Sequence, residues 1–281
     1  MNEEWTTVIK PKTGWFDIKL KEVWQYRDLI FMFIKRNFVS SYKQTILGPL
    51  WFLISPLLTS SIFTVVFGQI ARISTDGVPQ FLYYMAGNTA WAYFSSCLTS
   101  TSHTFTGNAY LFGKVYFPRL VSPVSTVIYA VFSFLIQTCL MLVLMVYFAF
   151  GRHEAVNPNL WIALVPVMVL QMAMLGMGCG IIISSLTTKY RDLSVLVGFG
   201  VQLWMYATPI VYPLSSVPSP LAKLIRYNPM TPVVNNFKYA FLGCGQPEIR
   251  SWALSWAVTL VVLTLGVVLF SRVEKTFMDT V

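Results

Sequence analysis

The chain has 281 residues, of which 56% are hydrophobic and only 11% carry a charge. Soluble domains contain about 25% charged residues, so this composition excludes an ordinary soluble protein and favours one that is surrounded by lipid. The net charge of +9 would suit a nucleic-acid ligand, but the basic residues lie in short segments between apolar runs, a pattern that membrane topology explains. We therefore expect no nucleic-acid partner.

The N-terminal segment, residues 1–45, is basic and contains one amphipathic stretch. Its first forty residues include seven Lys and Arg residues, where a signal peptide would have an apolar core. Between Leu20 and Phe38 the apolar residues gather on one side of a helical wheel. That face consists of Leu20, Val23, Trp24, Phe31, Ile34 and Phe38. The pattern predicts a cytoplasmic segment with a helix that lies on the membrane interface.

Six apolar runs follow, and each is long enough to cross a membrane as a helix of about 20 residues. The runs are continuous, whereas the strands of a membrane β-barrel alternate apolar and polar residues. The predicted spans are Ile46–Ile70, Phe81–Phe105, Pro123–Phe150, Leu160–Leu186, Leu193–Tyr212 and Trp252–Phe270. We therefore predict an all-α integral membrane protein with six transmembrane helices, in a domain of residues 46–272.

The distribution of Lys and Arg predicts the orientation of these spans, because basic residues are enriched in cytoplasmic segments. With the N-terminus inside, fourteen of the twenty Lys and Arg residues fall in inner segments and six in outer segments. Both termini are thus expected in the cytoplasm, including a short tail of residues 273–281.

The inner segment between the second and third spans, residues 106–120, reads TGNAYLFGKVYFPRL. Its aromatic and aliphatic residues make it too apolar for a free cytoplasmic loop, and Pro118 is expected to end any helix there. Residue types alone leave two interpretations open. The segment packs on lipid headgroups, or it forms a short helix that docks into a groove of a soluble partner.

The outer segment before the last span, residues 209–250, contains six prolines between Pro209 and Pro232. Its two apolar stretches, Leu221–Ile225 and Val233–Leu242, are too short to cross a membrane. Prolines end helices and bias the preceding residue toward extended conformations. The segment is therefore predicted to form two short re-entrant helices.

The sequence shows no pattern typical of a catalytic, nucleotide-binding or metal site. No Asp, Glu, Lys or Arg falls within a predicted span, which disfavours proton-coupled transport and intramembrane catalysis. Residues 107–115 read GNAYLFGKV, in which the spacing and the last residue depart from a phosphate-binding loop. The four cysteines have neither metal-ligand nor redox spacing. We expect no catalytic residues, metal or cofactor in this chain, and transport that is passive or powered by a partner.

Aromatic residues cluster in the second and fifth predicted spans. The candidates for a channel lining are Tyr83, Tyr84, Trp91, Phe94, Trp204 and Tyr206. Aromatic rings stack on sugar rings, but Trp and Tyr also concentrate at membrane interfaces and pack between helices. Residue types therefore leave a sugar-lined channel and a packing role equally open.

Five short motifs follow one another along the chain, from about Asp28 to Phe270. They are YKQTILGPLWFLISP at the first span, NAYLFGKVYFPRL in the inner segment, YRDL before the fifth span, TPIVYP at its end, and YNPMTPVVNNFKYAFLG before the last span. In this order they resemble the membrane subunits of ABC-type polysaccharide exporters, which move O-antigen, teichoic acid or capsule polymers across bacterial inner membranes.

The resemblance implies a non-catalytic permease in the bacterial inner membrane. Two copies of the chain would form the channel, and two separate ATPase subunits would bind ATP and Mg²⁺. The substrate would be a glycan on a polyprenyl diphosphate, and the outer re-entrant helices would gate its exit. Exporters of drugs or lipids with the same architecture are one alternative, and ion-coupled secondary carriers are another.

The resemblance also implies roles for individual residues. The inner segment becomes the helix that couples to the ATPase, with contacts from Asn108, Tyr110, Phe112, Lys114, Pro118 and Arg119. Lys35, Arg36 and Lys43 become candidates for contacts with lipid headgroups and with the diphosphate of the substrate. One position departs from the family pattern, because Lys238 stands where an arginine is expected. A lysine cannot make the two parallel hydrogen bonds of a guanidinium group.

Overall fold

The computed structural model describes residues 20–43, 47–154, 156–188 and 192–280, and every regular element in these ranges is helical. The predicted all-α class is therefore confirmed. Several predicted features lie wholly or partly outside the described residues. They are the N-terminal segment 1–19, residues 44–46 of the first motif with the start of the first span at Ile46, Tyr190 and Arg191 of the YRDL motif, and the last residue of the tail 273–281.

Within the described residues, four helical segments are long and apolar enough to cross a membrane. The first comprises a 3-10 turn (Gly48–Leu50), helix α3 (Trp51–Phe63) and a π-helical turn (Thr64–Ile70). The other three are α6 (Val121–Val146) with a π-helical end (Tyr147–Gly151), α7 (Val165–Thr187) after a 3-10 turn (Leu160–Leu164), and α11 (Ile249–Thr280). Each overlaps a predicted span, because a long apolar run is a strong signal for a membrane helix.

The other two predicted spans also form helices, but neither is both long and strongly apolar. α4 (Gln80–Ser102) has 23 residues and is more polar, whereas α8 (Leu193–Tyr206) has only 14 residues. α4 ends earlier than predicted, because the chain breaks at His103 and starts a new helix at Thr104. Other helices surround α4, so its hydroxyl and amide side chains need not face hydrocarbon.

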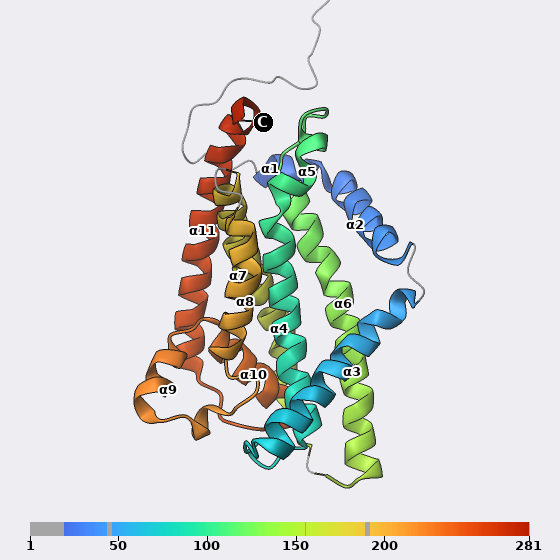
Figure 1. Ribbon diagram of the computed structural model, residues 1–281, viewed down its shortest axis with the longest axis vertical. Coiled ribbons are helices and arrows are strands. Elements are labelled where there is room, and N and C mark those ends of the chain that lie inside the picture. Colours follow the sequence, from blue (N-terminus) through green and yellow to red (C-terminus); the bar gives the residue numbers. More distant parts are fainter. Residues whose placement is uncertain (1–19, 44–46, 155, 189–191, 281) are drawn as a thin grey trace, which may run out of the picture.

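The helices form one bundle around α4. α4 packs against α3, α6, α7, α8 and α10 (Met230–Leu242), and α7 lies between α4 and α11 (Figure 1). α2 (Arg27–Tyr42) packs on α6 at the opposite side of the bundle from α11 (Figure 1). Large side chains of α4 such as Leu82, Tyr84 and Phe94 have no exposed surface. The core therefore follows the length of α4.

Glycines allow α7 to approach both of its neighbours closely. A Cβ atom on Gly180 would lie 2.6 Å from the Cβ of Thr101 and 2.7 Å from the carbonyl oxygen of Leu98, both in α4. On another side of α7, a Cβ atom on Gly178 would lie 2.9 Å from the Cα of Leu263 in α11. Small residues of this kind let helix backbones come together in membranes, where packing drives association.

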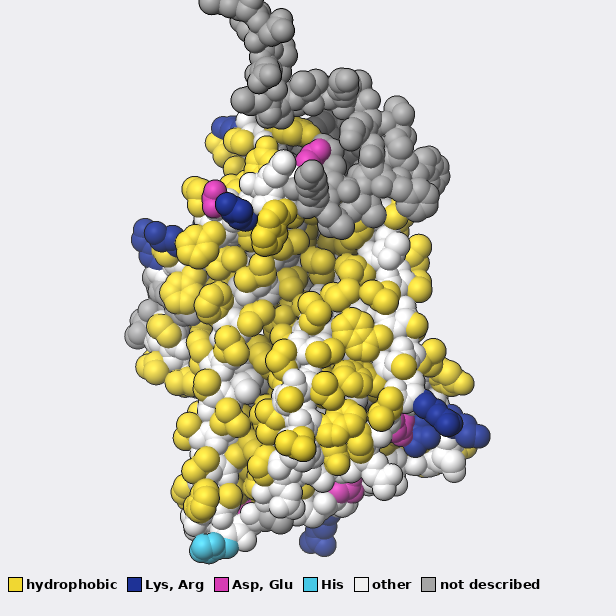
Figure 2. Space-filling view, turned by 180° about the vertical axis from the view of Figure 1, so that it is seen from behind, with side chains coloured by type: hydrophobic (Ala, Val, Ile, Leu, Met, Phe, Trp, Pro, Cys, Tyr) yellow, Lys and Arg dark blue, Asp and Glu magenta, His cyan; other side chains and the backbone are white. Residues whose placement is uncertain are grey.

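Charged and hydrophobic side chains separate along the length of the bundle. Hydrophobic side chains cover the middle of the face seen in Figure 2, and the visible charged side chains lie toward its two ends. One end carries α5 (Thr104–Phe112), and the other carries α9 (Ser219–Arg226) and α10 (Figure 1). We call these the α5 end and the α9 end. A hydrophobic belt between two charged ends is expected of a protein in a bilayer.

The predicted amphipathic helix is split at Tyr26 into α1 (Leu20–Gln25) and α2. Val23 and Phe33 are buried against the bundle, at 8% and 7% exposure. Of the predicted apolar face, Val23 is buried, whereas Trp24, Phe31 and Phe38 remain exposed. The place of this segment on the membrane interface stays a prediction, and these exposed apolar side chains are the ones that would contact lipid there.

The two short helices predicted before the last span are present. The stretch Leu221–Ile225 lies within α9, and Val233–Leu242 lies within α10. Prolines stand at the starts of both helices, with Pro220 in the first turn of α9 and Pro229 directly before α10. The missing N–H of proline costs little there, because the first N–H groups of a helix have no intrahelical partner.

Candidate functional site

Two polar contacts join α5 to neighbouring helices of the bundle. The backbone N–H of Phe105 donates to the hydroxyl of Ser184 in α7, at 3.2 Å. The side-chain amide of Asn108 donates to the hydroxyl of Ser122 at the start of α6, at 3.0 Å. Hydrogen bonds of this type join helices in membranes. Asn108, predicted to contact an ATPase, thus points toward α6.

Aromatic rings support α5 where it meets the bundle. Phe105 stacks on Phe270 of α11 with ring centres 4.5 Å apart. The guanidinium carbon of Arg119 lies 5.3 Å from the centre of the Phe112 ring, within the range of a cation–π interaction. Phe112, Pro118 and Arg119, also predicted to contact an ATPase, are buried. In this conformation they shape the turn after α5 and offer little surface to a partner.

The exposed surface of this segment consists of other side chains. Tyr110 is 77% exposed, and Val115 and Tyr116 are 55% and 56% exposed. Lys114 is exposed as well, and its amine lies 3.9 Å from the centre of the Tyr110 ring. We call Tyr110, Lys114, Val115 and Tyr116 the α5 face. Val115 and Tyr116 were not predicted contacts, and their apolar character in an inner segment was the signal that the sequence offered.

Four of the six aromatic residues predicted to line a channel are buried inside the bundle. They are Tyr83, Tyr84, Trp91 and Phe94, each at most 4% exposed. In this conformation Tyr84, Trp91 and Phe94 pack between helices, whereas Tyr83 lines the inner wall of a polar cavity at the α9 end. The other two lie on α8, where Trp204 is half-buried and Tyr206 is 46% exposed. Only these two reach the surface.

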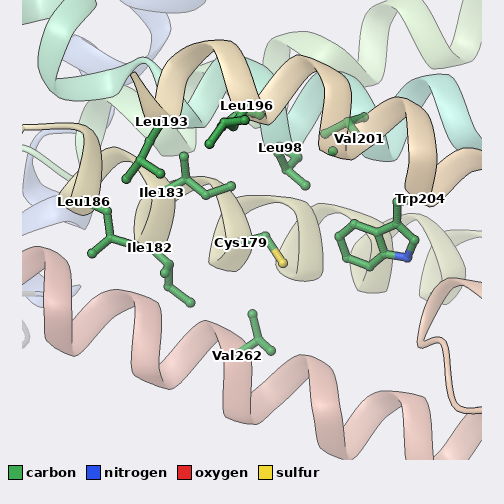
Figure 3. Close-up of a pocket in the computed structure, with 12 residues that line it drawn as sticks. Leu98, Cys179, Ile182, Ile183, Leu186, Leu193, Leu196, Val201, Trp204 and Val262 are labelled. Atoms are coloured by element: carbon green, nitrogen blue, oxygen red, sulfur yellow. The ribbon is translucent and has the colours of Figure 1, made fainter. Parts of the chain in front are cut away.

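α8 is attached to the bundle more loosely than α4 or α7. Within its length only Val201 is buried. An apolar cavity of about 500 Å³ separates α8 from α7 and α11, with Leu186 at one end and Trp204 at the other (Figure 3). The lining contains no ionisable side chain other than the thiol of Cys179. The cavity and the single buried residue show that α8 shares little contact surface with the rest of the bundle.

The exposed side of α8 carries a continuous row of large apolar side chains. Val195, Phe199, Leu203 and Tyr206 recur every three or four residues, and they are 78%, 63%, 54% and 46% exposed. This spacing places them on one face of the helix. We call these four residues the α8 stripe.

The three predicted headgroup cations lie on or directly after α2. Lys35, Arg36 and Lys43 are all exposed. The guanidinium carbon of Arg36 lies 4.6 Å from the centre of the Phe33 ring, which anchors α2 to the bundle. The fold therefore gathers three positive charges on one element, an arrangement that attracts anionic lipid.

At the α9 end, Lys238 is enclosed at 2% exposure. Its ammonium group donates to the carbonyl oxygens of Pro209 and Ile210, both at 2.8 Å, and lies 3.6 Å from the centre of the Tyr83 ring. Burial lowers the pKa of this amine to about 7, and the charge of Asp76 acts in the opposite direction. Single bonds to two separate carbonyls suit an ammonium group, so no bidentate contact is lost here.

Asn228 joins the end of α8 to the start of α10. Its side-chain oxygen accepts from the indole N–H of Trp204 at 2.9 Å and from the backbone N–H of Met230 at 3.0 Å. Its amide donates to the hydroxyl of Thr208 at 2.9 Å. No role was predicted for Asn228. The signal in the sequence was its place in an Asn-Pro pair, which marks a turn.

Comparison with known proteins gives matches along most of the chain. Residues 28–242 match the family described as ABC-2 type transporter. Two proteins of Klebsiella pneumoniae, both named O-antigen export system permease protein RfbA, are 27% and 26% identical over 253 and 254 residues, which cover 90% of this chain and 94% of each relative. A protein of the same name from Myxococcus xanthus is 27% identical over 265 residues, covering 93% of this chain and 98% of the relative.

Proposed function

The chain belongs to the ABC-2 type transporter family, and from this membership we propose that it is the channel-forming permease of an exporter for a lipid-linked polysaccharide of the O-antigen type. The observation that carries the proposal is similarity over 90% or more of the chain to permeases named for O-antigen export. The chain would supply the passage, and a separate ATPase subunit would bind ATP and Mg²⁺.

The proposed topology has six crossings of a bacterial inner membrane, with both termini in the cytoplasm. Four crossings correspond to the long apolar segments, and α4 would be a fifth, shielded from lipid by its neighbours. α8 would be the sixth. Its 14 residues rise only about 21 Å, less than the hydrocarbon core of about 30 Å, so protein has to cover its ends. α9 and α10 would provide that cover as re-entrant helices.

The ATPase subunit would dock at the α5 end. The α5 face offers Tyr110, Val115 and Tyr116 as apolar contacts and Lys114 as a charge, and exposed apolar patches of this type mark interaction sites. The buried residues Phe112, Pro118 and Arg119 would transmit movement of this face to the bundle, because they join it to α6 and to the aromatic rings beneath it.

The channel would lie between two copies of the chain related by a twofold axis, the commonest symmetry of homodimers. We infer that the α8 stripe faces the axis. A helix too short to cross lipid unaided is favoured at a protein interface, and the loose packing of α8 would let the passage widen. Tyr206 and Trp204 would then meet the passing glycan.

The substrate would enter with its polyprenyl chain in the membrane and its diphosphate at the cytoplasmic surface. The exposed cations Lys35, Arg36 and Lys43 would attract that diphosphate, since charge-assisted bonds to phosphate are strong. Their place on α2 or directly after it would also bring them near the headgroups of ordinary anionic lipids.

Deletion of the gene in its host tests this function. We expect polymer to disappear from the cell surface and to accumulate inside the cell on its lipid carrier, and deletion of the partner ATPase should have the same effect. Cells that keep normal surface polymer without this chain would contradict the proposal. Loss of resistance to drugs, with surface polymer intact, would favour a drug exporter instead.

A further inference from the structure

A polar cavity of about 340 Å³ lies at the α9 end, where the turn before α4 meets the segments around α9 and α10. We propose that this cavity binds one neutral sugar unit of the exported glycan. The proposal rests on the polysaccharide-export function argued above. The cavity is distinct from the α5 face and from the α8 stripe, because it shares no residue with either.

Segments that are far apart in the sequence supply the walls. Asp76 comes from the turn before α4, Ser215 from the turn before α9, and Gln246 from the loop before α11. Tyr83 and Lys238 are each 2% exposed and form the inner wall, whereas Ser215 and Gln246 are exposed at the rim. The cavity therefore exists only in the folded bundle and has a fixed, buried floor.

Polar contacts hold the walls in place. The hydroxyl of Ser215 donates to the carboxylate of Asp76 at 3.1 Å, and Arg226 forms an ion pair with Glu248 at 3.0 Å. Asp76 has a φ of +52°, a turn conformation that Asp tolerates better than most residues. Walls that are fixed before the ligand binds reduce the entropy lost on binding.

The cavity carries charges of both signs. Asp76 and Glu248 are negative and Arg226 is positive, whereas burial lowers the pKa of Lys238 to about 7, so this amine is only partly charged at neutral pH. Charges of opposite sign so close together leave a weak net field to concentrate a phosphate or a metal cation. The cavity does present donors and acceptors side by side, and hydroxyl groups are the ligands that both donate and accept. A neutral molecule rich in hydroxyl groups therefore fits better than an ion.

Two amide side chains in the cavity are available to a ligand. Asn235 and Gln246 line it, and within the described part of the chain neither side chain makes a hydrogen bond. An amide offers both donors and an acceptor. The volume of about 340 Å³ is at the low end of small-molecule sites, about 300–1,000 Å³. This size suits a single sugar unit rather than a long stretch of polymer.

A second polar cavity at the same end provides a comparison site. It has a volume of about 550 Å³ and is lined by Gln69, Gln80, Arg152 and Glu154 among others. Its ion pair is long, at 3.9 Å, and exposed. The amide of Gln80 already donates to the carbonyl of Gly68. This cavity lacks a buried charged floor and offers one available amide, Gln69, instead of two, so we expect no sugar binding there.

The test uses the polymer that accumulates in cells lacking this chain. The polymer is released from its lipid by mild acid, cut to short oligosaccharides, and added to the purified full chain in nanodiscs. Saturation-transfer NMR then reports binding. We expect Asn235→Leu and Gln246→Leu, combined, to raise the dissociation constant about tenfold, as the loss of two hydrogen bonds between neutral groups implies. Gln69→Leu in the comparison cavity should leave it unchanged.

Gln246 is exposed in a loop, so Gln246→Leu alone keeps the test decisive if Asn235→Leu fails to fold. Oligosaccharides that do not bind the wild-type chain, or that bind the Gln246→Leu variant as well as the wild type, would overturn the sugar site and leave the export function standing. Absence of accumulated polymer would overturn the export function, and the sugar site with it.

A second arm tests the charge argument. Inorganic phosphate at 10 mM should not displace the oligosaccharide, and raising NaCl tenfold should change its dissociation constant less than twofold, because a neutral ligand among charges of both signs offers little net interaction to screen. Displacement by phosphate would show an anion site and contradict the assignment.

Discussion

At the scale of single residues, Lys238 connects α10 to the chain that follows α8. We expect Lys238→Met to lower the free energy of unfolding by about 2 kcal/mol, because the carbonyl oxygens of Pro209 and Ile210 lose their donor in a buried place. Unfolding of the purified chain in detergent measures this, with the exposed Lys223→Met as the matched control. Equal stability of the two variants would show that these bonds contribute little.

The residues predicted to line a channel are of two kinds, those buried in the core and those exposed on α8. Trp91→Ala should destabilise the chain by about 4 kcal/mol, because it removes a large buried ring from the core. Tyr206→Ala should slow polymer export severalfold and change stability by less than about 0.5 kcal/mol, since its ring is half exposed. Thermal unfolding and surface polymer are measured for both. Normal export by Tyr206→Ala would make this residue a simple surface aromatic.

Sequence reasoning identified the apolar inner segment but could not divide its residues by role. Tyr110 and Lys114 are exposed on the α5 face, whereas Phe112 and Arg119 from the same motif are buried. A short run of mixed aromatic and basic residues does not reveal which side of a helix packs on its neighbours. The departure at Lys238 was visible in the sequence, but its two carbonyl partners depend on the path of the chain after α8.

At the scale of secondary-structure elements, the contact of α7 with α4 depends on glycine. Gly180→Ala should lower the free energy of unfolding by about 2 kcal/mol, since its Cβ would overlap Thr101 and the backbone of Leu98. Gly198→Ala on α8 meets no neighbouring atom within 4 Å and should leave stability unchanged or slightly higher. Chemical unfolding of both variants tests this. A Gly180→Ala protein no less stable than Gly198→Ala would mean that the helices separate at little cost.

α5 gives a second test at this scale. The double variant Tyr110→Ala with Lys114→Glu should reduce copurification of the ATPase subunit at least tenfold, because it removes an exposed ring and reverses a charge at the proposed docking surface. Tyr227→Ala with Lys223→Glu repeats the same changes at the same spacing on exposed residues of the α9 end. If both pairs of substitutions have the same effect on copurification, the docking surface lies elsewhere.

The bounds of the long apolar helices were the most predictable feature of the fold. The bounds of α6, α7 and α10 agree with the predicted runs within a few residues, because length and continuity of apolar residues decide them. The break at Tyr26 and the π-helical turns after α3 and α6 carried no such signal. α4 shows why hydropathy alone is incomplete: a helix enclosed by protein can be more polar than one that faces lipid.

At the scale of the whole molecule, the pairing of helices was beyond the sequence. Hydropathy does not predict which helices are neighbours, because the apolar runs are similar to one another. The place of α7 between α4 and α11 depends on the close approach of the backbones at Gly178 and Gly180. The same limit applies to the polar cavity of the α9 end, whose walls come from segments more than a hundred residues apart. Composition did predict the hydrophobic belt between two charged ends.

The proposed dimer is tested by cross-linking across the α8 stripe. In a Cys139→Ser background, which removes the one exposed cysteine, Phe199→Cys should give a disulfide or maleimide cross-link between two copies in membranes. Val143→Cys lies on the exposed side of α6 at 66% exposure and should stay monomeric. Cross-linking at residue 143 and none at residue 199 would move the interface to α6.

The most direct test of the account is transport by the purified chain and its ATPase subunit in proteoliposomes. We expect labelled lipid-linked glycan to cross the membrane only when ATP and Mg²⁺ are supplied on the side of the α5 face, and a pH gradient without ATP to move none. Glycan movement driven by a pH or sodium gradient, with no nucleotide hydrolysed, would contradict the claim that this chain forms a passage and a partner supplies the energy.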